Sequence, residues 1–394
     1  DLIHWEFKGV PMLPDQPYDC HGAYSGSALV EGDQMSLFYT GNVKNLGDYN
    51  YITNGRESNT ILAVSKDGEK IDSKKLLMTI ADYPDDLTCH VRDPKVWKEG
   101  GRYYMVQGAR TKEDKGVVLV FSSEDKYHWS CIHRLESEET FGFMWECPDL
   151  YELDGQTILC ISPQGVEQDG YWYANKYQTV TSVIRGDFRT DGVPEGFREL
   201  DGGFDFYAPQ TFLTEDGRRI LIGWMGMADA EDEYTNRTTE DGWQNVLTLA
   251  RELSLKDGIV CQNPVRELSS WWNEEVSFEG QYTGNTDICY ELNLKNTEKK
   301  WEVLIAGGLK LSWSPEEYVF RMEFTDGKLG CGRGLRAREM KACKDIRIVV
   351  DVSCVEVFMN GGKDVFSTRF YPEKDQYTVK ASGEGLTGSY RYRV

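Results

Sequence analysis

Short apolar runs alternate with glycine-containing turns along the first two thirds of the chain. Four times an apolar run leads into a turn that contains Gly32, Gly100, Gly155 or Gly217, and a second apolar run follows. Two such runs around a turn predict a β-hairpin. The expected strand pairs are 27–30 with 35–40, 94–97 with 103–107, 149–151 with 157–161, and 211–213 with 220–224. Helical periodicity is poor throughout.

The four hairpins recur at a nearly constant interval. Their turn glycines lie 68, 55 and 62 residues apart, which is a period near 60. A hairpin unit repeated at a fixed period is typical of a β-propeller, which protects its sheet edges by radial repetition. On periodicity alone, a large β-sandwich with four similar hairpins is the alternative. We expect a propeller.

The pattern changes near residue 270 to a strict alternation of apolar and polar positions. Period-two strands joined by Gly or Asn turns predict a C-terminal β-sandwich. The Asn360-Gly361 step is a strong hairpin signal. We therefore expect an all-β protein with a propeller domain over residues 1–270 and a β-sandwich over residues 271–394. The expected sandwich strands are 288–294, 301–305, 318–324, 346–350, 355–359 and 377–381.

Charge and composition restrict the partners. With 44 Lys and Arg against 65 Asp and Glu, the formal net charge is −21, which repels nucleic acid and anionic lipid. No window approaches the roughly 20 apolar residues of a membrane helix. We therefore expect neither a nucleic-acid partner nor a membrane partner. The 11 Trp and 22 Tyr favour a small polar ring-shaped ligand, a saccharide. Nothing in the sequence indicates the oligomeric state.

Cysteine and histidine usage gives no sign of a metal or a cofactor. Ten cysteines are scattered without a C-x-x-C step and without paired spacing to the five histidines. This favours reduced structural thiols over disulfides. The opening residues 1–6 carry no basic start followed by an apolar run, so no signal peptide is visible and a cytoplasmic protein is expected, with secretion left open.

Polar residues at similar positions of successive repeats are candidates for one shared site. Ser25, Asp93, Glu146 and Tyr207 lie seven, seven, nine and ten residues before their turn glycines. Glu146 follows Met144 and Trp145 and precedes Cys147, so we expect a desolvated, protonated general acid, while Asp93 beside Arg92 stays ionised. Two carboxyl groups with separated pKa values are what glycosidic cleavage requires. Surface turn acids are the alternative.

Aromatic residues recur at the same positions. Tyr24, Trp145, Phe206, Tyr207 and Trp224 would either stack on a sugar ring or pack between blades.

Several segments resemble, in order and spacing, the signatures of the invertase and fructanase family, glycoside hydrolase family 32. They are AYSGS at 23–27, RDP at 92–94, WECPDL at 145–150, FDFYAPQ at 204–210, GW at 223–224, LTLARELSL at 247–255 and DVSCVEVF at 351–358. The resemblance implies a five-bladed propeller joined to a β-sandwich. It also implies retaining hydrolysis of terminal β-D-fructofuranosides, such as sucrose, sucrose 6-phosphate or short fructans, through a covalent fructosyl-enzyme intermediate.

The resemblance also implies roles for individual residues. Glu146 would be the acid/base, and Asp93 with Arg92 beside it would hold fructose hydroxyls and stabilise the transition state. The residues that would shape the fructose pocket are Tyr24, Ser25, Asp205, Tyr207 and Trp224.

One departure from the family is serious. The family's nucleophile is an Asp in a Trp-Met-Asn-Asp-Pro-Asn-Gly motif, which these residues lack, and neither Asp15 nor Asp19 has its context. We expect the motif upstream of Asp1, which leaves the first blade incomplete. A non-catalytic sugar-binding protein and an inverting five-bladed glycosidase of the arabinanase type are the alternatives. For a 6-phosphate, His90, Arg110 or Lys95 could serve, and their spacing does not decide among them.

Overall fold

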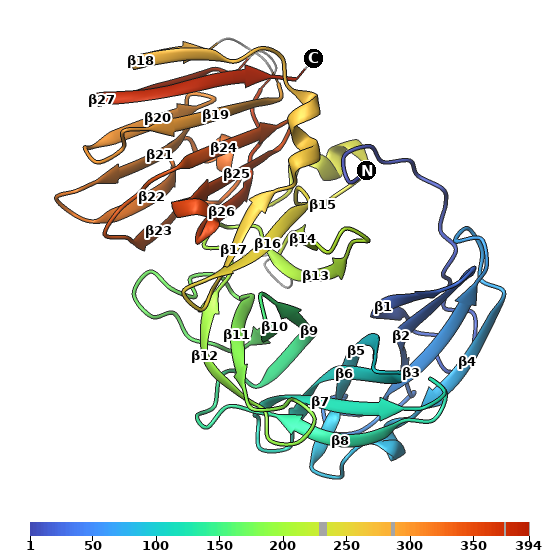
Figure 1. Ribbon diagram of the computed structural model, residues 1–394. Coiled ribbons are helices and arrows are strands. Elements are labelled where there is room, and N and C mark those ends of the chain that lie inside the picture. The colour runs from blue at the N-terminus through green and yellow to red at the C-terminus, as the bar shows by residue number, and fades with distance from the viewer. Residues whose placement is uncertain (228–234, 285–287, 374–375, 394) are drawn as a thin grey trace. The chain divides into compact units, whose positions relative to one another are not determined.

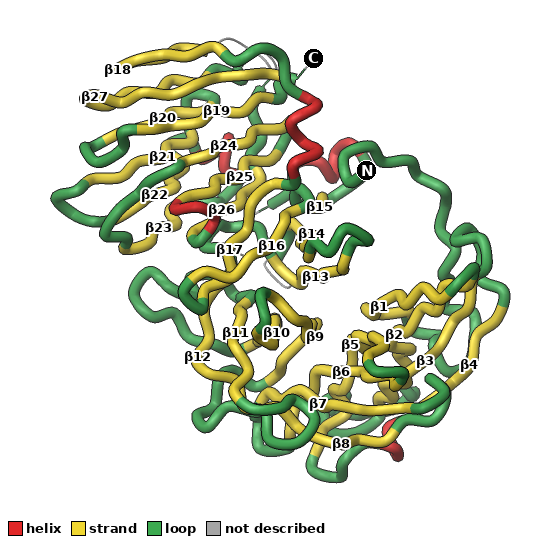
Figure 2. Tube along the Cα trace, viewed as in Figure 1, coloured by secondary structure: helices red, strands yellow, loops and turns green. Residues whose placement is uncertain are grey.

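The computed structural model describes residues 1–227, 235–284, 288–373 and 376–393. Strands make up most of these residues, as Figure 2 shows, which confirms the all-β class. The helical segments of the described residues are α1 (Gly327–Gly330) and the 3-10 helices η1 (Ile80–Asp82), η2 (Arg237–Asp241), η3 (Arg266–Trp271) and η4 (Asn360–Gly362). No helix in this part of the chain is long and apolar enough to cross a bilayer.

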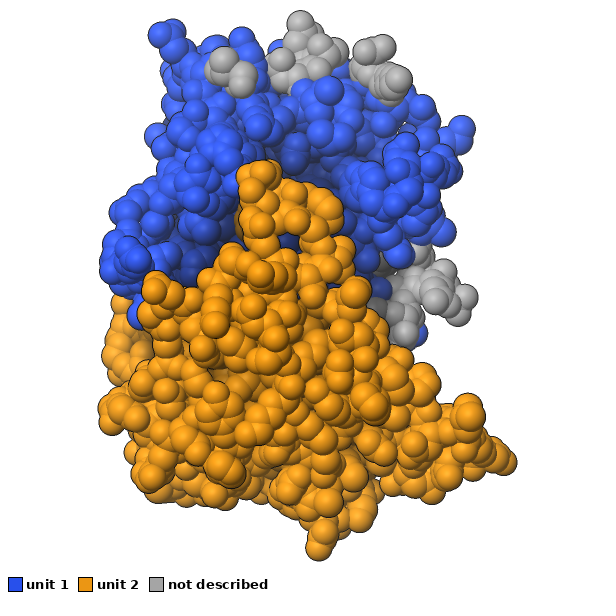
Figure 3. All heavy atoms as spheres, turned by 90° about the vertical axis from the view of Figure 1, so that its right-hand side faces the viewer, with its two compact units in different colours: residues 1–4, 167–179, 199–394 blue, residues 5–166, 180–198 orange. Residues whose placement is uncertain are grey.

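The chain divides into two compact units, which Figure 3 colours separately. Unit 1 comprises residues 1–4, 167–179 and 199–394, and unit 2 comprises residues 5–166 and 180–198. Each unit has its own sheets and its own core, and each is described by itself.

Unit 2 consists of three four-stranded antiparallel sheets, each a meander in chain order. Their inner strands are neighbours, because β5 contacts both β1 and β9 (Figure 1). The first sheet contains β1 (Ala23–Glu31), β2 (Gln34–Lys44), β3 (Arg56–Ser65) and β4 (Ser73–Met78). The second contains β5 (Leu87–Glu99), β6 (Arg102–Thr111), β7 (Gly116–Ser123) and β8 (Ser130–Leu135). The third contains β9 (Met144–Leu153), β10 (Gln156–Gln164), β11 (Val180–Arg185) and β12 (Val193–Glu199).

The core of unit 2 explains why these segments become strands. Every residue of β7 is buried, and Phe121 packs with Phe38 from the first sheet and Met105 from the second. Burial on both faces of a strand favours the continuous apolar runs seen in the sequence. The first and second sheets of the unit therefore pack against one another through this apolar core.

The four predicted hairpins are all present. Three have two-residue loops, because Glu31 pairs with Gln34, Glu99 with Arg102 and Leu153 with Gln156. The fourth, in unit 1, closes with Leu213 opposite Arg219. Glycines at positive φ occupy each of these turns, where an L-residue would be strained.

Unit 1 contains a fourth blade-like sheet and a ten-stranded sheet. The blade-like sheet comprises β13 (Tyr207–Leu213), β14 (Arg219–Met225), β15 (Val246–Leu247), β16 (Arg251–Lys256) and β17 (Ile259–Pro264). The ten-stranded sheet comprises β18 (Val276–Gly284), β19 (Tyr290–Lys295), β20 (Trp301–Ile305), β21 (Leu309–Ser314), β22 (Val319–Phe324), β23 (Leu335–Glu339), β24 (Ile346–Asp351), β25 (Cys354–Met359), β26 (Asp364–Arg369) and β27 (Val379–Tyr392).

The long strand β27 folds the ten-stranded sheet into a sandwich. Its first part pairs with β20 and its last part with β19, while β18 pairs with both parts. The two halves of the sheet enclose an apolar core that includes Trp301, Phe320 and Phe366. The predicted hairpin at Asn360-Gly361 joins β25 to β26, with both residues at positive φ.

Four blade-like sheets and a C-terminal β-sandwich thus confirm the propeller-plus-sandwich class. The fifth blade and the domain boundary between residues 270 and 271 stay predictions.

One glycine lets the third sheet of unit 2 approach the second. A Cβ atom on Gly108 of β6 would lie 1.8 Å from the carbonyl oxygen of Trp145 on β9. Gly108 pairs with Arg92 of β5, and its contact partner Trp145 precedes Glu146 on β9. The close contact therefore lies beside candidate site residues on both strands. Any side chain at position 108 would push β9 away from β5 and β6.

We predict that Gly108→Ala lowers the unfolding free energy by about 1–3 kcal/mol, the usual cost of overpacking, and lowers activity because Glu146 moves relative to Arg92. Urea denaturation and kcat/KM measure the two effects. Gly334→Ala is the matched control, since a Cβ atom there meets nothing within 4 Å. Equal stability of the two variants would contradict this account of the contact.

Candidate active site

A β-bulge interrupts the inner strand of each blade-like sheet at the same place. In each case two residues of the inner strand face one residue of the next strand. The bulged pairs are Tyr24-Ser25, Asp93-Pro94, Cys147-Pro148 and Ala208-Pro209. Bulges re-aim side chains and are frequent beside active sites.

The bulges correct the predicted alignment of the repeats. Asp93, Cys147 and Ala208 all begin a bulge and all have positive φ, so they are the equivalent residues. Glu146 comes one residue earlier and is equivalent to Arg92, not to Asp93. All four candidate residues lie within one position of the first bulge residue: Asp93 begins its bulge, Ser25 is the second residue of its bulge, and Glu146 and Tyr207 each precede theirs.

Arg92 holds the Glu146 carboxyl group. The guanidinium group donates from Nε and Nη2 to Oε1 of Glu146 at 3.1 and 2.7 Å. The amide of Gln164, on β10, donates to Oε2 at 2.7 Å. Charge-assisted bonds of this kind are stronger than neutral ones, and they fix the orientation of the carboxyl group.

The Glu146 carboxyl group is mostly buried and has polar partners. Trp145 is fully buried, and its indole donates to the carbonyl oxygen of Phe141. Successive side chains of a strand point to opposite faces, so Trp145 points away from the face of Glu146, whereas Met144 shares that face. The Glu146 side chain keeps 16% exposure and lies against a guanidinium group. The protonated state expected for Glu146 stays a prediction.

Asp93 lies on the neighbouring inner strand and is tied to β9. Its Oδ2 accepts the backbone N–H of Cys147 at 2.8 Å, and its own N–H donates to Thr40 Oγ1 at 3.0 Å. Arg92 Nε lies 4.0 Å from Oδ2. The structure therefore brings Arg92, Asp93 and Glu146 together within unit 2.

Burial dominates the pKa of Asp93. Burial raises the pKa of this carboxyl group, the Arg92 charge opposes the rise, and the Glu146 charge adds to it. Desolvation wins because Asp93 is only 6% exposed. The expectation that Asp93 is ionised beside Arg92 stays a prediction.

His90 sits between two arginines beside this group. Its Nδ1 lies 2.8 Å from Arg92 Nη1 and its Nε2 lies 3.2 Å from Arg56 Nη1. Burial and the charges of Arg92, Arg56 and Arg110 lower the pKa of His90 to about 3. The imidazole is therefore neutral at physiological pH.

Tyr24 and Ser25 form the bulge of β1 in the same unit, and both are exposed. Lys95 is occupied elsewhere, since its Nζ lies 3.2 Å from Oδ2 of the buried Asp149. Asp19 is fully buried and accepts from Tyr39 and Lys74, while Asp15 is exposed and also pairs with Lys74. Neither aspartate lies in the group formed by Arg92, Asp93 and Glu146.

Tyr207 and Trp224 come together in unit 1. They are opposite one another in the register of β13 and β14, and their ring centroids are 6.4 Å apart. Tyr177 contributes a third ring, 5.9 Å from Tyr207. Tyr207 is buried, whereas Trp224 is half-buried and presents part of its ring.

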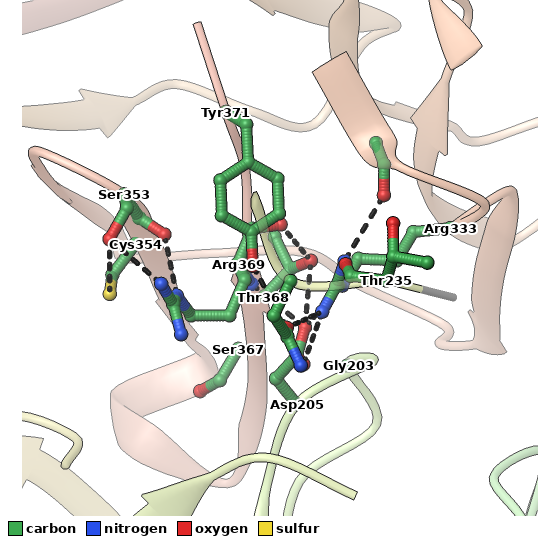
Figure 4. Close-up of polar contacts among 12 residues, drawn as sticks. Gly203, Asp205, Thr235, Arg333, Ser353, Cys354, Ser367, Thr368, Arg369 and Tyr371 are labelled. Atoms are coloured by element: carbon green, nitrogen blue, oxygen red, sulfur yellow. Dashed lines mark hydrogen bonds and ion pairs between the residues drawn. The ribbon is translucent and has the colours of Figure 1, made fainter. Parts of the chain in front are cut away.

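Asp205 has a different environment from the one predicted. Its carboxylate is fully buried and accepts from Arg333 Nε at 2.7 Å and Nη2 at 2.8 Å, and from the N–H of Arg369 at 2.8 Å. Figure 4 shows the Arg333 guanidinium group directed at this carboxylate. This buried network gives Asp205 a structural position, and its contact with a sugar stays a prediction.

Sequence reasoning missed Gln164, Arg56 and Arg333, whose partners lie far away in the chain. The described residues contain no group of three His, Cys, Asp or Glu placed to hold a metal ion. All ten cysteines belong to the described residues, and the structure records each as a free thiol.

Two carboxyl groups on neighbouring inner strands, with an arginine between them, are the kind of pair that glycoside hydrolases use. The sequence profile of the glycosyl hydrolases family 32 N-terminal domain matches residues 1–264, and that of the family 32 C-terminal domain matches residues 327–391. The chain belongs to glycosyl hydrolase family 32.

Curated relatives and solved structures agree with this assignment. The sucrose-6-phosphate hydrolase of Bacillus subtilis is 35% identical, over 98% of this chain and 81% of its own. That of Salmonella typhimurium is 36% identical, over 94% of this chain and 78% of its own. The β-fructofuranosidase of Bombyx mori superposes with a TM-score of 0.80 at 32% identity, over 94% of this chain and 79% of its own. The sucrose-6-phosphate hydrolase of Lactobacillus gasseri superposes with a TM-score of 0.89 at 25% identity, over 100% of this chain and 83% of its own.

We predict that Asp205→Ala lowers the unfolding free energy by about 3–5 kcal/mol, because Arg333 is then left charged and buried without its partner. Denaturant unfolding measures the effect, and the double variant Asp205→Leu with Arg333→Met should recover part of it. Asp216→Ala, which removes an exposed partner of Arg218, should cost less than about 1 kcal/mol. Wild-type stability of Asp205→Ala would contradict the structural position.

We predict that Asp93→Asn raises stability at pH 7. The folded state binds the Asp93 proton more tightly than the unfolded chain does, so stability falls as the pH rises through the raised pKa. The variant does not lose stability in this way. Its stability advantage over the wild type should therefore disappear below pH 3.8, the ordinary pKa of Asp. Urea unfolding between pH 3 and pH 7 checks the sign.

Asp86→Asn is the control of opposite sign, since Arg134 lowers the pKa of Asp86 and its carboxylate stabilises the fold at neutral pH. The prediction fails if Asp93→Asn is less stable than the wild type at pH 7.

Proposed function

We propose that this protein hydrolyses terminal β-D-fructofuranosides with retention of configuration, through a covalent fructosyl-enzyme intermediate. The observation that carries the proposal is the group formed by Arg92, Asp93 and Glu146 on neighbouring inner strands. Family membership and the names of the relatives support the same activity.

Glu146 is the proposed acid/base. In the first step a nucleophilic carboxylate attacks the anomeric carbon, the glycosidic bond breaks, and the Glu146 proton passes to the leaving oxygen. In the second step Glu146 takes a proton from water, which attacks the anomeric carbon and releases the enzyme carboxylate. Arg92 and Gln164 orient the Glu146 carboxyl group for both transfers.

Asp93 is the proposed ligand for fructose hydroxyls. The Cys147 N–H engages its Oδ2, and no described residue donates a hydrogen bond to its Oδ1. That oxygen is available to a sugar hydroxyl, and the rigid bulge holds it in place before substrate arrives. Because the Asp93 carboxyl group is held in this fixed position, we expect it also to stabilise the transition state.

Further parts of the proposal come from the family resemblance. They are the nucleophilic Asp upstream of Asp1, the fifth blade, the domain boundary between residues 270 and 271, and sugar contacts by Tyr24, Ser25, Tyr207 and Trp224. The cytoplasmic location stays a prediction. Sucrose and sucrose 6-phosphate are the proposed substrates, because the relatives are named for hydrolysis of sucrose 6-phosphate and of β-fructofuranosides.

We predict that Glu146→Gln in the full-length protein lowers kcat for sucrose and for sucrose 6-phosphate by roughly 10²–10⁴-fold, the usual contribution of a general acid/base. The amide keeps the shape of the side chain but cannot donate and recover a proton. Release of fructose measures the effect, and the alkaline limb of the pH profile should disappear.

Glu152→Gln is the matched control, because Glu152 lies on the same strand β9 and is exposed. Near-normal turnover by Glu146→Gln would refute the assignment. A full-length wild type that binds sugar but releases no fructose would favour the non-catalytic alternative.

A further inference from the structure

Four basic side chains gather beside Glu146 in unit 2, on three strands of two neighbouring sheets. This basic cluster consists of Arg56 on β3, His90 and Arg92 on β5, and Arg110 on β6. His90 contacts Arg56 and Arg92 directly, and the charge of Arg110 also reaches it. The cluster stands out in a chain with a formal net charge of −21.

The arginines of the cluster differ in their counter-charges. Arg92 is paired with Glu146, and Arg110 is paired at 2.6 Å with the exposed Asp114. Arg56 has no carboxylate partner within the described part of the chain, and its buried Nε makes no hydrogen bond there. A guanidinium group that is partly desolvated without a counter-charge is costly, unless an anion completes it.

The imidazole of His90 can accept from only one of the two arginines. A neutral ring has one acceptor nitrogen, and Nδ1 lies 2.8 Å from Arg92 whereas Nε2 lies 3.2 Å from Arg56. The shorter contact favours Arg92 as the donor to the ring. The buried Nε of Arg56 has no acceptor among the described residues in either tautomer.

Arg56 also lies next to the proposed sugar site. Tyr24 and Arg92 both interact electrostatically with Arg56. Arg56 thus connects an exposed tyrosine of the β1 bulge with the arginine that holds the proposed acid/base. A substrate bound with its leaving group next to Glu146 would therefore lie close to the Arg56 guanidinium group.

We propose that Arg56, supported by Arg110, binds the phosphate of a phosphorylated disaccharide and makes the site selective for a fructoside with a phosphorylated leaving group. This inference rests on the proposed function. A guanidinium group offers a planar fork of N–H donors that matches phosphate oxygens, and it stays charged at all physiological pH values. His90 is neutral and Lys95 is bound to Asp149, so Arg110 is the one of the three cations considered from the sequence that belongs to the proposed site, and Arg56 is added from the structure.

The test compares two substrates in one enzyme. For the full-length protein, kcat/KM is measured with sucrose 6-phosphate and with sucrose, and the ratio of the two values is followed. Arg56→Gln should lower this ratio about 10- to 100-fold, the usual worth of a hydrogen-bonded charge. Adding Arg110→Gln should lower it further, and Arg56→Lys should keep part of it.

Arg102→Gln is the matched control, because Arg102 lies at the opposite end of β6 and pairs with the exposed Glu124. Its ratio should equal that of the wild type. Inhibition of sucrose hydrolysis gives an independent readout: glucose 6-phosphate should inhibit more strongly than inorganic phosphate, and Arg56→Gln should weaken the inhibition by glucose 6-phosphate.

The outcomes separate this inference from the proposed function. If the wild type cleaves neither substrate, the proposed function fails. If it cleaves both and Arg56→Gln leaves the ratio unchanged, or inorganic phosphate inhibits as well as glucose 6-phosphate does, the phosphate site is refuted while the proposed function stands.

Discussion

The bulge near the start of each inner strand is the constraint on which the site depends. A regular ladder would make successive side chains alternate between the two faces of a sheet, and Asp93 would then be separated from its neighbours on β9. The extra residue turns the strand, and the Asp93 backbone adopts φ +64. Such strain persists only where surrounding contacts over-determine it. Thr40 and the Cys147 N–H supply those contacts.

The hairpins were predictable because their signal is local. A glycine turn between two apolar runs requires only a few residues, and all four expected pairs formed. The bulges are also local, but their signal is easily missed. Pro94, Pro148 and Pro209 each follow a residue with positive φ and cannot donate to a ladder, which marks the interruption. Counting back from the turn glycines locates the bulges only to within one residue, because the distance between bulge and turn differs among the four hairpins.

Electrostatic partners were less predictable, because they join residues far apart in the chain. Asp205 and Arg333 are 128 residues apart, and only the folded sandwich brings them together. The motif around Asp205 resembles a family signature, yet the buried carboxylate accepts from Arg333 and Arg369. The partner of Glu146 was not predictable for the same reason. Arg92, which holds its carboxyl group, comes from the adjacent sheet and lies 54 residues away in the chain.

The distribution of charge explains how an acidic protein can hold an anion. At physiological ionic strength the Debye length is about 8 Å, so most surface carboxylates of this chain are screened from a ligand at the basic cluster. The local groups decide the interaction. Among the described residues, the charge of Arg92 acts on Arg56. The charge of Arg110 acts on His90, which lies between Arg56 and Arg92. Because Arg92 is paired with Glu146 and Arg110 with Asp114, Arg56 is the arginine of the cluster without a carboxylate partner among the described residues, and the proposed selectivity depends on that side chain.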